Sequence, residues 1–134
     1  MIVVSGTTAI TTLLKAGMEG LLPQLFESVT IPQPVRDELL AFHSQLPNFV
    51  LPRSVGRADQ RLPETVALGR GEAEAITLAR EINADLLLTD DLQARSIAAS
   101  LDIKCTGLLG LLIRAKQRGR ITSVKKAIGN LETR

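Results

Sequence analysis

Two hydrophobic periods alternate along this chain. Short aliphatic runs such as Leu86-Leu87-Leu88 are typical of buried strands, whereas apolar residues spaced three or four apart, such as Ile10 and Leu13, are typical of amphipathic helices. The pattern predicts strands at residues 1–5, 28–31, 49–51, 85–89 and 102–105. It predicts helices at residues 9–16, 19–26, between Pro32 and Pro47, and at 70–82, 91–100, 107–118 and 122–131.

Strands that alternate with helices indicate a mainly parallel sheet covered on both faces. We therefore predict a three-layer α/β/α fold with a central sheet of four to five strands. The 134 residues fit one domain, predicted to span residues 1–134. Residues 53–68 are polar and weakly patterned, and a loop of this length is often functional.

The composition narrows the classes of function. Aromatic residues make up only 2% of the chain against 45% hydrophobic residues, so the core is aliphatic and base-stacking platforms are not expected. Cys105 is the single cysteine and excludes an internal disulfide. The sequence contains no apolar run of membrane-spanning length and no recognisable export signal. We expect a cytoplasmic protein with no membrane partner.

The charge is unevenly distributed, although the net charge is only +2. Residues 1–109 contain nine Lys or Arg and thirteen Asp or Glu, whereas residues 110–134 contain seven Lys or Arg and one acid. A basic end beside an acidic centre suits a polyanion whose phosphates are held while metal ions bridge the acids. A basic helix end that merely keeps the protein in solution explains the pattern equally well.

Acidic residues follow the predicted strands. Glu38 lies on the helix after the second strand, Glu72 and Glu74 lie in the first turn of the 70–82 helix, and Asp90 and Asp91 follow the 85–89 strand. The carboxyl ends of parallel strands share one edge of a sheet. Carboxylates gathered there repel one another, and hard cations prefer such oxygen ligands. The pattern predicts a Mg²⁺ or Mn²⁺ site able to support phosphodiester hydrolysis.

Each acid also has an ordinary interpretation when it is taken alone. Glu72 and Glu74 could interact with the positive end of a helix dipole. Asp90 could cap the following helix, and Asp91 could pair with Arg95 four residues later. Only the joint occurrence of these acids at strand ends favours a metal site.

Four segments together carry a resemblance to a known family. They are MIVVSGTTAITTLLKAG, IPQPVRDEL, LGRGEAEAITLA and LLLTDDLQARSIA, in that order along nearly the whole chain. With these segments the sequence resembles the PIN-domain ribonucleases, in particular the small prokaryotic VapC-like toxins. The resemblance implies a Mg²⁺- or Mn²⁺-dependent endoribonuclease with an RNA substrate, a cognate antitoxin protein as partner, and a homodimer.

The resemblance also implies a set of site residues. The second family acid falls on Glu38. The third falls on Glu72, with Glu74 as a substitute, and the fourth falls on Asp91, with Asp90 as its close rival.

The turn after the first strand departs from the family pattern. The first family acid falls on Gly6, which has no side-chain oxygen, whereas Thr7 and Thr8 match hydroxyl positions that orient water or phosphate. An engineered change and a natural loss would both account for Gly6. We expect a weakened or inactive ribonuclease. The alternative is a catalytically dead PIN-like module that acts by binding an antitoxin-like protein or RNA.

Overall fold

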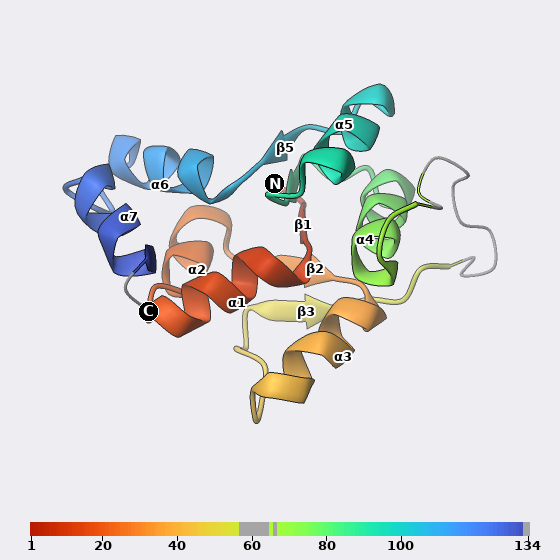
Figure 1. Ribbon diagram of the computed structural model, residues 1–134, viewed down its shortest axis with the longest axis horizontal. Coiled ribbons are helices and arrows are strands. Elements are labelled where there is room, and N and C mark those ends of the chain that lie inside the picture. Colours follow the sequence, from red (N-terminus) through yellow and green to blue (C-terminus); the bar gives the residue numbers. More distant parts are fainter. Residues whose placement is uncertain (57–64, 66, 133–134) are drawn as a thin grey trace.

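A parallel sheet forms the centre of the protein in the computed structural model, which describes residues 1–56, 65 and 67–132 (Figure 1). Within these residues the sheet has five strands in the order β3-β2-β1-β4-β5, and every neighbouring pair is parallel. The strands are β1 (Val3–Ser5), β2 (Val29–Ile31), β3 (Val50–Pro52), β4 (Leu86–Leu88) and β5 (Cys105–Thr106). The predicted fold class is confirmed.

Helices cover both faces of this sheet and complete three layers. They are α1 (Thr7–Ala16), α2 (Leu21–Phe26), α3 (Gln33–Phe42), α4 (Arg70–Glu81), α5 (Leu92–Ser100), α6 (Leu108–Gln117) and α7 (Val124–Glu132). The helices α4 and α5 pack on one face, and the other described helices pack on the opposite face. No helix in the described ranges is long and apolar enough to span a membrane.

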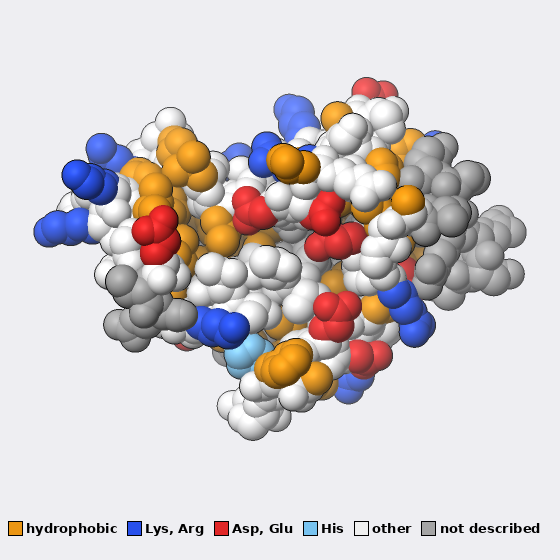
Figure 2. All heavy atoms as spheres, viewed as in Figure 1, with side chains coloured by type: hydrophobic (Ala, Val, Ile, Leu, Met, Phe, Trp, Pro, Cys, Tyr) orange, Lys and Arg blue, Asp and Glu red, His pale blue; other side chains and the backbone are white. Residues whose placement is uncertain are grey.

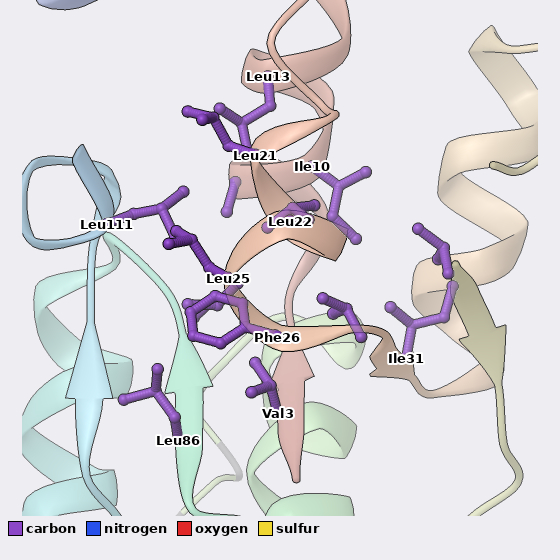
Figure 3. Packing of buried hydrophobic residues seen from close by; sticks show 14 of the residues in the cluster. Val3, Ile10, Leu13, Leu21, Leu22, Leu25, Phe26, Ile31, Leu86 and Leu111 are labelled. Atoms are coloured by element: carbon purple, nitrogen blue, oxygen red, sulfur yellow. The ribbon is translucent and has the colours of Figure 1, made fainter. Parts of the chain in front are cut away.

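The alternation of side chains along the strands explains the two cores. Leu86 and Leu88 point into the larger core with Val3, while Leu87 and Val4 point into the smaller core beneath α4 and α5. Figure 3 shows the larger core, where Val3 and Leu86 from the sheet meet aliphatic side chains from α1, α2 and α6. Because both faces of the sheet are buried, β4 is apolar throughout and β1 is apolar up to the buried Ser5 at its end, which is typical of parallel sheets.

Several element boundaries differ from the sequence prediction, among them the residues at which the first helix and the last strand begin. The first helix begins at Thr7, directly after Gly6, and not at residue 9. The last strand was predicted at 102–105 but begins at Cys105, because a turn with Asp102 at φ 60° closes α5 first, and the Ile103 amide donates to the Ala98 carbonyl. Most of the predicted 53–68 loop lies outside the described residues.

The strand order creates a crevice at one edge of the sheet. The chain builds β1, β2 and β3 outward in one direction, then returns to place β4 on the other side of β1. This reversal separates the connections that leave β1 and β4, and ligands of open parallel sheets bind at the carboxyl ends of the strands there. Gly6 follows β1 and Thr89 follows β4 at this point.

Candidate acidic active site

A pocket of about 480 Å³ lies at the carboxyl ends of β1 and β4. In Figure 2 acidic side chains gather near the middle of the visible face. The residues that line the pocket are Thr7, Thr8, Glu38, Gly69, Arg70, Gly71, Glu72, Asp90 and Asp91. The structure thus brings the acids predicted at Glu38, Glu72, Asp90 and Asp91 together with Thr7 in one pocket.

Gly6 adjoins this pocket and faces Glu72. Its backbone is extended, with φ −80° and ψ 179°, a conformation that any residue adopts. A Cβ atom at position 6 would lie 2.7 Å from Glu72 Oε1. The backbone therefore does not require glycine, and the Glu72 carboxylate lies against the space that a larger side chain at position 6 would enter.

Glu72 is the most perturbed acid of the pocket. It lies half-buried in the first turn of α4, and its Oε2 accepts a hydrogen bond of 3.1 Å from Thr89 Oγ1. Burial raises the pKa of Glu72, the Thr89 hydrogen bond opposes that rise, and the charges of Asp91 and Glu38 add to it. Glu38 and Asp91 are therefore near enough to disfavour a negative charge on Glu72.

Glu38 approaches the pocket from α3. Its Oε2 accepts a hydrogen bond of 2.8 Å from Thr7 Oγ1, which fixes an otherwise exposed side chain. A Cβ atom at Gly71 would lie 2.6 Å from Glu38 Oε1. The glycine at the start of α4 therefore allows the Glu38 carboxylate to approach the α4 backbone closely.

Asp90 and Asp91 line the same pocket while each contacts a different helix. Asp91 is the N-cap of α5, where its Oδ1 accepts from the Ala94 amide at 2.8 Å. Both oxygens of Asp90 lie 3.2 Å from the Leu108 amide, at the beginning of α6. The expectation that Asp90 could cap the following helix was therefore wrong, because Asp91 fills that role.

Two other interpretations of the sequence are settled by contacts. Glu74 is buried and pairs with Arg70, with Nε 3.1 Å from Oε2, so it does not line the acidic pocket. Asp91 and Arg95 form no ion pair in the described part of the chain, because Asp91 is turned toward the α5 amides.

The oxygen atoms that line the pocket are of the kind that bind a divalent cation, but they are not arranged to hold one. Carboxylate and hydroxyl oxygens are the ligands that Mg²⁺ and Mn²⁺ prefer. Among the described residues, however, no three His, Cys, Asp or Glu side chains are grouped closely enough to hold one ion. Asp90 and Asp91 are engaged by backbone amides, and Gly6 contributes no donor.

Sequence reasoning did not assign Thr89 to the site. Its hydroxyl donates to Glu72 and accepts a 3.2 Å hydrogen bond from the Asp91 amide, so it joins two of the acids. A lone hydroxyl residue immediately after three leucines was the available signal. Arg70 and the glycines that flank it also line the pocket and carried no signal of their own.

These features define a nuclease-type α/β/α domain with an acidic edge. A family model described as a PIN domain matches residues 2–134, and the chain therefore belongs to the PIN-domain family. Proteins of this family generally use divalent metal ions.

A solved structure agrees with this fold. The chain is similar to a PilT N-terminus domain protein from the hyperthermophilic archaeon Sulfolobus solfataricus P2, with 23% identity and a TM-score of 0.66. The match covers 84% of this chain and 92% of that one, and at this identity it shows the fold alone. No curated protein sequence gives a significant match.

Proposed function

We propose that this chain is a metal-dependent endoribonuclease of the PIN type, related to the small prokaryotic VapC-like toxins, and that Gly6 weakens it. One observation carries the proposal. Glu38, Glu72 and Asp91 come from α3, α4 and the end of β4, yet they line one pocket at the crevice of the sheet. Burial is the main cause of the raised pKa of Glu72, the charges of Asp91 and Glu38 add to the rise, and a cation would offset that repulsion.

The chain's own residues would position the ion and the substrate. Glu38, Glu72 and Asp91 would hold Mg²⁺ or Mn²⁺, and Asp90 is close enough to assist. Thr7 and Thr89 would orient two of these carboxylates through the hydrogen bonds they already make. When bound, the ion would offset negative charge on the scissile phosphate of RNA.

Gly6 explains why this site would be weak. A carboxylate at position 6 would enter from the end of β1 beside Glu72, which lines the same pocket as Glu38. Without it the acids do not converge on one point, which agrees with the lack of a three-acid group in the described residues. In this proposal Gly6 is a missing ligand in a pocket where Asp90 and Asp91 also accept hydrogen bonds from backbone amides.

Restoring the acid tests the proposal. Gly6→Asp should increase Mn²⁺-dependent cleavage of a labelled single-stranded RNA by about tenfold or more, the scale on which metal-site groups affect activity. Gly6→Asn is the matched control, because it adds the same bulk against Glu72 without the charge. The gain should disappear on chelation and in the Gly6→Asp/Glu72→Gln double variant. Equal activity of the Asp, Asn and parent forms would refute the proposal.

The incomplete group of acids also favours a second candidate. In this alternative the chain is a catalytically dead PIN-like module that acts by binding an antitoxin-like protein or RNA. It predicts no cleavage by either the parent or the Gly6→Asp form, with binding retained in both. As part of either proposal we expect a homodimer, which sedimentation would detect.

A further inference from the structure

A second pocket, of about 490 Å³, lies at the β5 edge of the sheet between α5 and α6. Three cationic side chains line it, from three separate segments: Arg95 on α5, Lys104 just before β5, and Arg114 on α6. Among the described residues, no acidic side chain lines this pocket. We call it the basic pocket, in contrast to the acidic pocket at the strand ends.

The three cations have no carboxylate partner among the residues that the structure describes. Across the described ranges, Arg95, Lys104 and Arg114 form no ion pair, unlike Arg36 and Arg70, which do. The Arg114 guanidinium lies 5.5 Å from the centroid of the Phe26 ring, and its Nη1 contacts Met1 Sδ at 3.7 Å. These contacts hold the charge in place without neutralising it.

The basic and acidic pockets adjoin each other. Arg95 Nη1 lies 3.6 Å from the position that a Cβ atom at Gly107 would occupy, and Asp90 Oδ1 lies against the same position. Asp90 lines the acidic pocket, whereas Arg95 lines the basic one. In Figure 2 Lys and Arg side chains lie above the acidic group, over the region where Figure 1 places β5.

We propose that the basic pocket binds backbone phosphates of the RNA strand whose scissile phosphate occupies the acidic pocket. Unpaired cations of one sign, gathered around one hollow, attract an anion and gain by releasing its counterions. This inference rests on the proposed function, because it assigns the path of the same substrate.

The continuity of the two pockets argues for a strand and not for a free anion. A small phosphate would need only the basic pocket, and its binding would not depend on the acidic pocket nearby. A polyanion that passes from one pocket to the other uses Arg95 at the boundary, then Lys104 and Arg114 beyond it. The cations also offset the repulsion that the uncompensated acids exert on RNA.

Matched charge removals test this path. Lys104→Gln removes an exposed charge from the basic pocket, and Lys125→Gln removes an equally exposed charge from α7 as the control. Affinity for a labelled single-stranded RNA is measured by fluorescence anisotropy over a range of salt concentrations. At about 0.1 M salt, Lys104→Gln should weaken binding about fivefold and reduce the salt slope by about 0.7, the contribution of one single-strand phosphate contact. Lys125→Gln should leave both unchanged.

A chemical probe gives a second readout that does not involve cleavage. Cys105 is the single cysteine, lines the basic pocket and is partly exposed. RNA should slow its alkylation by a neutral maleimide in the parent protein, and much less in an Arg95→Gln/Lys104→Gln double variant. Inorganic phosphate at equal phosphate concentration should not protect.

The outcomes are distinct from those that test the nuclease. Equal losses for Lys104→Gln and Lys125→Gln, or no RNA binding at low salt, would overturn the basic pocket as a strand site. Equal protection by inorganic phosphate would also overturn it in favour of a small-anion site. A Gly6→Asp form that fails to cleave while Lys104 still controls RNA binding would instead refute only the nuclease.

Discussion

The middle of the central strands and their carboxyl ends differ in the side chains that surround them. In the middle, Leu87 on β4 and Val4 on β1 are fully buried among aliphatic side chains. A few ångströms along the same strands, the chain gathers carboxylates whose charges oppose one another, and the pKa of Glu72 rises. One region is optimised for stability, whereas the other is held in an arrangement that costs free energy.

This contrast indicates where function lies. Parallel strands buried on both faces anchor the backbone, so the residues that follow them are placed by the fold. A cluster of like charges on such a scaffold is typical of a functional site. Three substitutions test the contrast, in order of decreasing effect on stability.

The largest effect is expected inside the sheet. Leu87→Ala should lower the free energy of unfolding by about 3 kcal/mol, because it removes buried surface and leaves a cavity beneath α4 and α5. Urea denaturation measures the change. Leu51→Ala, on a strand side chain that is 47% exposed, is the control and should cost much less. Similar losses at both sites would contradict the assigned core.

A smaller effect is expected at the edge, where Asp91 combines a structural and a proposed binding role. Asp91→Ala should cost about 1 kcal/mol, because α5 loses its N-cap acceptor. Asp91→Ser should recover most of that stability, since serine also caps helices. In the Gly6→Asp background neither variant should be stabilised by Mn²⁺, whereas Gly6→Asp alone should be, because Asp91 is a proposed ligand. Thermal melts with and without the ion separate the two roles.

The smallest expected effect is a gain in stability when Glu72 is replaced by glutamine. Because the pKa of Glu72 is raised on folding, the folded protein binds its proton more readily than the unfolded chain. The free energy of unfolding therefore falls as the pH rises from 4.5, the ordinary value, through the raised pKa. Glu72→Gln should raise the melting temperature at pH 7 by a few degrees at most, and the gain should vanish below pH 4.5.

Glu74→Gln is the control for this gain. Glu74 lies two residues from Glu72 in the same helix, but its substitution would break the ion pair with Arg70 and should not stabilise the protein. A neutral or negative effect of Glu72→Gln at pH 7 would contradict the raised pKa of Glu72, to which burial contributes most and the charges of Asp91 and Glu38 contribute less.

The sequence predicted the fold because both hydrophobic periods were clear. It could not choose between Glu72 and Glu74, since both stand near the beginning of one helix and their roles depend on what packs around it. In the structure Glu72 faces the pocket and Glu74 is buried beside Arg70. Side chains two residues apart on a helix point to different sides. The elements that pack around the helix therefore decide which of the two acids faces the pocket.

The basic pocket could not be predicted for a similar reason. Arg95, Lys104 and Arg114 lie in three segments and share no motif. The sequence left open whether the basic C-terminal residues hold phosphates or only keep the protein in solution, and of the described residues in that group Arg114 lines the pocket. The path of α6 beside β5 brings these charges together, and local patterns do not contain that information.

Asp90 and Asp91 tie the chemistry of the crevice to the two outer layers. Asp90 accepts a hydrogen bond from an amide of α6 on one face of the sheet, and Asp91 accepts one from an amide of α5 on the other face. A cation that draws either oxygen inward must compete with the first turn of that helix. A cation bound in the crevice would therefore act on helices at opposite faces of the sheet through two neighbouring residues.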